Sequence, residues 1–299
     1  MDMLTRNILD ALTSPADYLP KQLIRFGVRC LGFFWDVIDR VQGQNFDVLP
    51  PLYIRIQANS NIRVTSYRKY GEFYMHYFKS VCELSSNSRV LDVGCGSGIV
   101  AAPLTTFIDK TGRYEGFDLN KQLISWCKRS ISSHYPNFHF SAVDVYNGKY
   151  NSTGKTSPID FRFPYKKNYF DLVVLSSVFT HMLPIDIEHY VSEIARVLKR
   201  DGKCVISYML ISPTVNTLMN KKVVSVDFKY SFGNYRTISI PKNNATYEDI
   251  VAYDIKYIRN LYKKNGLKII EPIHFGYWSG RVNTSRLHKQ DIIIAAKIR

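Results

Sequence analysis

The stretch that decides the fold is Val90-Leu-Asp-Val-Gly-Cys-Gly-Ser-Gly98. An apolar strand pattern carries Asp92 near its end and runs into glycines at positions 94, 96 and 98, and a helical pattern follows. Glycine lets the backbone turn sharply and brings N–H groups and a helix N-terminus close to a ligand. The sequence therefore predicts a ligand-binding turn between a buried strand and a helix.

Strand and helix patterns alternate on the C-terminal side of this turn. Helices are expected through about Phe107, through about Ser132 and over 185–199, and the strands between them read RVLDVG, RYEGFD, HFSAVDV, FDLVVLSS and KCVISYML. Such alternation predicts an α/β fold with a doubly wound, parallel sheet. A polar stretch (212–246), a helix over about 247–265 and two last strands, LKIIEPIHF and DIIIAAKI, follow.

The first part of the chain predicts helices without strand alternation. We expect a helical N-terminal extension over 1–65, a main domain over 66–299 and a substrate-side insertion over 211–246. A helix over 23–40 is apolar around most of its circumference, broken only by Arg25, Arg29, Asp36 and Arg40. It is either buried in protein, with Asp36 and Arg40 paired, or it lies in a membrane interface with its arginines at the headgroups.

Net charge and cysteine content limit the classes of partner and the cellular compartment that fit this chain. The 299 residues carry a net charge of +15, of which 9 comes from 211–299, where 15 basic side chains face 6 acidic ones. Such a surface favours anionic partners. The five cysteines have no CxxC spacing, which argues against a zinc site and a disulfide framework and fits a reducing cytosol. The N-terminus is a poor signal peptide, and no run is long and apolar enough to span a bilayer.

The glycine spacing separates two classes of nucleotide-binding turn. A dinucleotide-binding turn would place a third glycine at position 99, where this chain has Ile99. The spacing D-x-G-x-G-x-G instead resembles motif I of class I S-adenosylmethionine-dependent methyltransferases. FDLVVLSSVFTHM (170–182) and SEIARVLKRDGKCVIS (192–207) match later motifs of that family, over roughly residues 60–299. The resemblance implies a Rossmann-like, seven-stranded, mostly parallel sheet and S-adenosylmethionine as cofactor.

The same resemblance implies roles for residues at the strand ends. Asp118, 24 residues beyond Gly94, would accept hydrogen bonds from the ribose, and Asp144 with the N–H of Val145 would bind the adenine. The residues expected at the cofactor are Asp92, Gly94, Cys95, Gly96, Gly98, Asp118, Leu119, Asp144, Val145 and Ser176. No metal is expected.

A narrower resemblance lies near the C-terminus. The turn Gly276-Tyr-Trp-Ser-Gly-Arg281 and the Gln290-Asp291 before the last strand resemble a group of bacterial methyltransferases, many of them from envelope glycan, lipid or natural-product pathways. Tyr277, Trp278 and Arg281 would then bind the methyl acceptor through an aromatic face and a guanidinium. Simple packing is the alternative for Trp278.

The acceptor side is less determined. His181 follows the fourth strand and is the expected general base, with helix capping or packing as an equally weighted alternative. We expect O-methylation of a small molecule or of a glycan or envelope precursor, with an anionic small-molecule, glycan or lipid-linked acceptor. A nucleic-acid methyltransferase and a non-catalytic binding module are the alternatives, although Ser176-Ser-Val-Phe179 replaces the D/N/S-P-P-Y/F/W block of amino methylases.

Overall fold

The computed structural model describes residues 36–38, 41, 48–58, 64–241, 246–282, 284 and 288–298. The chain divides after Tyr67 into two units, which we describe separately. In the described part of the chain, no helix combines the length and the apolar character needed to cross a membrane.

The described part of the first unit is mostly helical. Residues 36–38 are helical, helix α3 spans Leu52–Ala58, and α4 begins at Val64. The rest of the helix expected over 23–40, including Arg40, lies outside the described residues. Asp36 forms an ion pair with Arg55 at 3.0 Å and also accepts a hydrogen bond from the N–H of Leu52. Because the Arg55 side chain is fully buried, this pair ties residue 36 to the start of α3.

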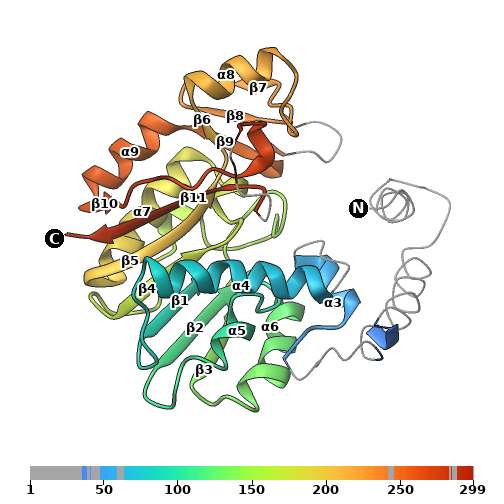
Figure 1. Cartoon of the computed structure of the whole chain (residues 1–299), viewed down its shortest axis with the longest axis vertical. Helices are drawn as coiled ribbons and strands as arrows, with labels where there is room; N and C mark the ends of the chain where they lie inside the picture. The colour runs from blue at the N-terminus through green and yellow to red at the C-terminus, as the bar shows by residue number, and fades with distance from the viewer. Residues whose placement is uncertain are drawn as a thin grey trace. The chain divides into compact units, whose positions relative to one another are not determined.

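The second unit is built on a seven-stranded sheet in the order β10-β11-β5-β4-β1-β2-β3 (Figure 1). Its strands are β1 (Arg89–Val93), β2 (Arg113–Asp118), β3 (Phe138–Ala142), β4 (Phe170–Leu175), β5 (Leu198–Tyr208), β10 (Leu267–Ile269) and β11 (Asp291–Lys297). Strands β1 to β5 pair in parallel, whereas β11 is antiparallel to both β5 and β10. The expected α/β fold with a seven-stranded, mostly parallel sheet is confirmed.

Helices cover both faces of this sheet. On one face, α7 (Pro184–Val197) and α9 (Ile255–Lys264) pack apolar side chains such as Ile194 and Ile258 against β4 and β5. On the other, α4, which ends at Ser80, lies beside α5 (Ala101–Leu104) and α6 (Lys121–Cys127) follows β2 (Figure 1). The helix expected through Phe107 is thus shorter, and the one expected through Ser132 ends in a π-turn over Lys128–Ser132.

A second, smaller sheet is formed by strands within residues 210–254, which include the insertion expected over 211–246. Its strands run in the order β6 (Leu210–Ile211), β9 (Val251–Asp254), β8 (Tyr235–Thr237) and β7 (Tyr230–Ser231), and α8 (Pro213–Asn220) packs beside it (Figure 1). The helix expected from residue 247 is wrong in its first half. Residues 251–254 pair with β8 and β6, and Asp254 caps α9 by accepting hydrogen bonds from the N–H groups of Lys256 and Tyr257.

The order of strands fixes where a ligand can bind. Strand β1 lies between β4 and β2. The strands that follow β1 run outward through β2 to β3 toward one edge of the sheet, and β4 and β5 then build the sheet outward on the other side of β1. Crevices outside the carboxyl ends of the strands open at such a reversal point in doubly wound sheets. The segments after β1, β2, β3 and β4 therefore form the candidate site.

Candidate active site

The glycine turn starts directly after β1. Gly94 has a positive φ of +73°, and a Cβ at this position would lie 2.4 Å from Cγ2 of Val178 in the turn after β4. A side chain is excluded both by the backbone conformation and by this close approach. The turns after β1 and β4 therefore touch, as the order of strands requires.

The N–H groups of the turn are largely used within the protein. Those of Gly94 and Cys95 donate to the carbonyl oxygen of Phe117 at 2.8 and 3.1 Å, and that of Gly96 donates to Oδ2 of Asp118 at 2.8 Å. A dinucleotide turn aims such groups at a pyrophosphate. In this turn the N–H groups bond to β2 instead. The N–H of Cys95, which was expected at the cofactor, is therefore engaged by Phe117, and the Cys95 thiol is buried.

Asp92 carries an unusual buried carboxylate. Its Oδ2 accepts a hydrogen bond from the Tyr114 hydroxyl at 2.6 Å, while its Oδ1 is buried and has no hydrogen-bond partner among the described residues. Burial raises the pKa of Asp92 to about 7, the Tyr114 hydrogen bond opposes this, and the nearby Asp118 adds to it. A buried carboxylate oxygen without a donor is costly unless a ligand supplies one.

Asp118 ends β2 at the same edge. Its Oδ1 accepts from the N–H of Asn120 at 2.8 Å, and its Oδ2 accepts from Gly96 as described. Burial raises the pKa of Asp118, and these backbone donors oppose the rise. Each oxygen keeps lone pairs for further donors, as two ribose hydroxyls would require. Leu119 follows it, half-buried.

Asp144 and Val145 follow β3. The Asp144 side chain is exposed, and its Oδ1 accepts from Nδ2 of Asn151 at 3.2 Å. Val145 is buried, and its carbonyl oxygen accepts from the same amide at 3.0 Å. Asn151 thereby fixes the backbone that an adenine would contact.

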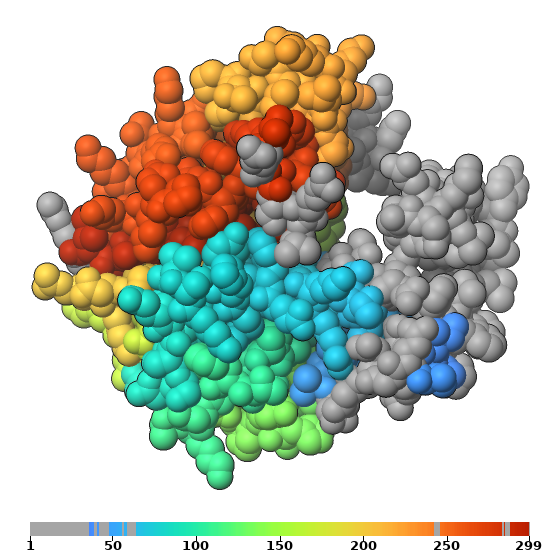
Figure 2. Space-filling model, in the orientation of Figure 1, coloured from blue at the N-terminus to red at the C-terminus, as the bar shows by residue number. Residues whose placement is uncertain are grey.

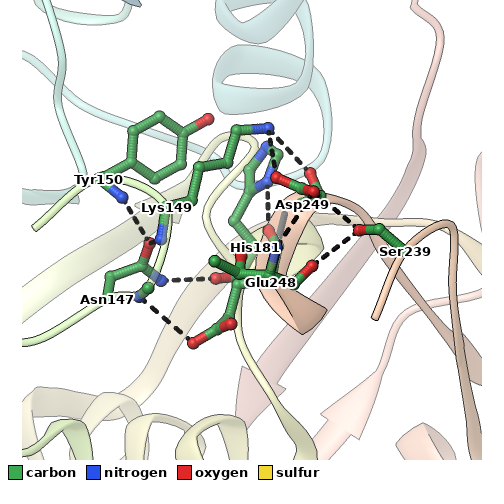
Figure 3. Close-up of polar contacts among 9 residues, drawn as sticks. Asn147, Lys149, Tyr150, His181, Ser239, Glu248 and Asp249 are labelled. Atoms are coloured by element: carbon green, nitrogen blue, oxygen red, sulfur yellow. Dashed lines mark hydrogen bonds and ion pairs between the residues drawn. The ribbon is translucent and has the colours of Figure 1, made fainter. Parts of the chain in front are cut away.

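His181 lies in a polar cluster formed by two loops (Figure 3). Its Nδ1 is 3.0 Å from the carbonyl oxygen of Glu248. Its ring packs edge-on against the ring of Tyr150, with 5.2 Å between the two ring centroids. Figure 3 shows Lys149 and Asp249 beside the imidazole, and Lys149 Nζ donates to the Asp249 carbonyl oxygen at 3.0 Å. Burial, and secondarily the Lys149 charge, lowers the pKa of His181 to about 4.

Ser176 directly follows β4 and faces α4. The hydroxyls of Tyr70 and Tyr74 both lie 3.0 Å from its Oγ. Tyr70 and Tyr74 lie one turn apart on α4, and no sequence pattern indicates that they meet a strand end more than one hundred residues away. Their partner His288 was missed altogether, because no local pattern marks it.

The three residues expected to bind the acceptor lie differently. Tyr277 is 45% exposed, whereas Trp278 is fully buried against Phe228 and donates from Nε1 to Asp291 at 2.8 Å. The expectation of an aromatic face at Trp278 is wrong, because packing covers the ring. Arg281 is 10% exposed and 3.5 Å from Asp291, and its guanidinium stacks on Phe275, so a structural ion pair occupies the charge expected for a ligand.

The described residues fit S-adenosylmethionine. The orphaned Oδ1 of Asp92, the lone pairs of Asp118 and a turn too tight for side chains meet at one edge. Within the described ranges, no three His, Cys, Asp or Glu side chains cluster as a metal ion would need.

Comparison with known proteins agrees with the fold. The order of strands is that of the class I methyltransferase fold. Residues 91–206 match the family described as "Methyltransferase domain", and this family implies S-adenosylmethionine as methyl donor. The expected class is thereby confirmed, whereas nothing in the comparisons bears on the bacterial subgroup.

Individual relatives are more distant. Protein 235L of Invertebrate iridescent virus 6, whose name is that of a methyltransferase, is 26% identical over 175 residues, which are 58% of this chain and 57% of that protein. The 2-phytyl-1,4-naphtoquinone methyltransferase of Nostoc is 26% identical over 161 residues, 54% of this chain and 61% of the enzyme. The match thus spans less than two thirds of either relative.

Among solved structures, the PH0226 protein of Pyrococcus horikoshii is similar in fold. Its TM-score is 0.51 at 16% identity, over 80% of this chain and 93% of that one. The likeness supports the fold alone.

Proposed function

We propose that this protein transfers the methyl group of S-adenosylmethionine to an oxygen of a small molecule, glycan or lipid-linked envelope precursor. One observation carries the proposal: the carboxylates of Asp92 and Asp118 end neighbouring parallel strands beside the glycine turn, and one oxygen of Asp92 lacks a donor. An ammonium or hydroxyl of the cofactor supplies such a donor.

Each strand end then has a binding role. Asp118 accepts hydrogen bonds from the ribose, Asp144 and the Val145 backbone hold the adenine, and Asp92 stabilises the amino-acid end. When bound, the cofactor supplies an electrophilic methyl group on a sulfonium, so alignment is the main task left to the chain.

The nature of the acceptor follows from the surroundings of the site. Lys149 and the exposed Tyr150 lie in the loop after β3, and the basic last third of the chain supplies most of the excess charge. These features favour an anionic or aromatic acceptor. The name of the Nostoc relative, which specifies a small organic acceptor, supports the same class. The C-terminal G-x-W-x-G-R turn supports the bacterial subgroup.

For His181 we propose the structural role that the sequence left open beside that of a base. A carbonyl oxygen only accepts hydrogen bonds, so Nδ1 carries the proton that Glu248 binds, and the Tyr150 ring covers one edge of the imidazole. The neighbouring Lys149 ammonium disfavours a positive charge on the ring. His181 therefore holds the loops after β3 and β8 together.

The compartment is also a proposal. The four described cysteines, Cys82, Cys95, Cys127 and Cys204, are free and buried, which supports a reducing cytoplasm. The helix expected over 23–40 would decide between a protein contact and a membrane contact. Flotation of the full chain with anionic liposomes tests this, since we expect no binding.

A methyl-transfer screen tests the function. Purified protein is incubated with methyl-labelled S-adenosylmethionine and pools of envelope sugars, lipid-linked intermediates, small phenols and RNA, and mass shifts are read. We expect a shift of one methyl in a small-molecule, glycan or lipid pool. A shift in RNA alone would establish the nucleic-acid alternative. S-adenosylhomocysteine binding without any product would favour the non-catalytic module.

A further inference from the structure

A chain of side-chain hydrogen bonds connects α4 with the end of β4 and the segment before β11. The Tyr74 hydroxyl donates to Ser176 Oγ at 3.0 Å, the Tyr70 hydroxyl lies 3.0 Å from the same oxygen, and His288 Nε2 lies 3.0 Å from the Tyr70 hydroxyl. Figure 2 shows the surface of α4 bordering that of the last part of the chain. Three segments distant in sequence thus share one polar network.

The direction of every bond in this network follows from one backbone carbonyl. His288 Nδ1 lies 2.8 Å from the carbonyl oxygen of Gln290, which can only accept, so Nδ1 carries the proton. Nε2 of a neutral imidazole then accepts from Tyr70, and Tyr70 oxygen accepts from Ser176. Tyr74, whose contact with Nε2 is longer at 3.4 Å, donates to Ser176. All donors point toward His288.

The network lies beside the expected cofactor turn. Gly71, between the two tyrosines, approaches the turn so closely that a Cβ would lie 2.7 Å from the carbonyl oxygen of Ile99. Burial raises the pKa of Tyr74, which keeps its hydroxyl protonated as the donor to Ser176. Ser176 follows the same strand end whose Val178 touches Gly94.

The network is open to a ligand at two atoms. Tyr74 and His288 are buried, at 0% and 2% exposure, whereas Tyr70 and Ser176 are partly exposed. The oxygens of Tyr70 and Ser176 each have two lone pairs, of which the network uses one. Both can therefore accept a hydrogen bond from a hydroxyl group, with the remaining lone pairs of that hydroxyl left free to attack.

We propose that Tyr70 and Ser176 form the binding subsite for the acceptor hydroxyl and that His288 receives its proton through them. The inference rests on the proposed function. The acceptor oxygen forms a bond to the methyl carbon as the carbon–sulfur bond breaks and leaves its electron pair on sulfur. The proton of the acceptor moves to Ser176, that of Ser176 to Tyr70, and that of Tyr70 to Nε2 of His288, which ends as imidazolium.

A weak base suffices for this step. Burial lowers the pKa of His288 to about 4, which keeps the imidazole neutral and able to accept at ordinary pH. The acceptor hydroxyl becomes a far stronger acid than imidazolium as its oxygen bonds to the methyl carbon, so proton transfer to the network is favourable in the same step. Ser176 and Tyr70 are the catalytic residues here, and His288 acts through them.

The test uses phenol, which carries the reacting hydroxyl and little else. Protein with carbon-13 labelled histidine rings is saturated with S-adenosylhomocysteine and titrated with phenol, and the His288→Gln variant identifies the His288 signal among the seven histidines. We expect phenol to shift this signal. The Tyr70→Phe and Ser176→Ala variants break the chain, so each should abolish the shift and weaken phenol binding about tenfold. Tyr77→Phe, on the same helix but outside the network, is the matched control.

The outcomes separate the inference from the proposed function. A wild-type His288 signal that phenol leaves unchanged, with S-adenosylhomocysteine bound, overturns the subsite, as does a shift that persists in both variants. Failure of S-adenosylhomocysteine to bind overturns the proposed function first and the inference with it. On an acceptor from the screen, His288→Gln should reduce kcat about a hundredfold at unchanged KM. Full turnover by this variant overturns the proton step.

Discussion

Oδ2 of Asp118 accepts a hydrogen bond of 2.8 Å from the backbone N–H of Gly96, so the acidic end of β2 holds the glycine turn that follows β1. One carboxylate thus shapes the turn and keeps lone pairs for a ligand. The proposed cofactor site should therefore depend on this side chain in two ways, through direct contact and through the conformation of the turn.

Replacing Asp118 with alanine should weaken S-adenosylhomocysteine binding by roughly 1.5–3 kcal/mol, because a charge-assisted acceptor for two hydroxyls is lost. Isothermal titration calorimetry measures this. Asp227→Ala, a change at an exposed carboxylate far along the chain, should leave the affinity unchanged. Equal affinity in the Asp118 variant and the wild type would remove Asp118 from the site.

Asp92 should make stability depend on pH. Its pKa is raised from 3.8 to about 7 on folding, so the folded state binds the proton more tightly than the unfolded state. This favourable contribution is complete below pH 4 and is lost as the pH rises to about 7. Denaturant unfolding of the free protein should therefore show a flatter pH dependence between pH 4 and 7 for Asp92→Asn than for the wild type, with Asp227→Asn as control. Parallel curves for all three proteins would contradict the assignment.

The His181→Ala variant distinguishes a general base at this position from a residue that only stabilises the fold. Loss of the buried bond to Glu248 should reduce the free energy of unfolding by about 1–3 kcal/mol. Turnover on an acceptor from the screen should fall less than tenfold, whereas loss of a general base costs roughly a hundredfold or more. A hundredfold loss of kcat at unchanged stability would restore His181 as the base.

Asp291 should be a major determinant of stability. It is fully buried and accepts hydrogen bonds from the N–H groups of Leu210 and Gly276 and from Trp278, with Arg281 at 3.5 Å. Asp291→Ala leaves a guanidinium without its counter-charge and should cost about 3–5 kcal/mol in unfolding experiments. Trp278→Phe removes one of these bonds and should cost about 1–2 kcal/mol. If Asp291→Ala lost less free energy of unfolding than Trp278→Phe, Asp291 would not have this role.

The sequence predicted what depends on local pattern. Short apolar runs that alternate with helical patterns, and a glycine turn after Val93, predict β1 to β5 directly, and the spacing from Gly94 to Asp118 predicts a cofactor site at one edge of the sheet. The helix expected over 247–265 failed because residues 251–254 are apolar enough for either element, and pairing with β8 and β6 decides.

Contacts between distant segments account for the remaining differences. Trp278 lies in a glycine-flanked turn of the kind that can present an aromatic ring to a ligand. Only its contacts with Asp291 and Phe228 show that the ring is covered. The contact between Tyr70 and His288 spans 218 positions, so no window of sequence contains both. Side-chain networks of this kind are set by the packing of whole elements, which periodicity does not specify.

The place of β11 in the large sheet has a consequence for synthesis of the protein. Asp291–Lys297 lies between β5 and β10, so an interior strand comes from the far end of the described chain. While the ribosome still holds these residues, β5 presents a long unpaired edge and the partners of Asp291 lack their acceptor. The nascent protein therefore depends on protection of that edge, for example by a chaperone, until residues 291–297 have left the ribosome and paired with β5.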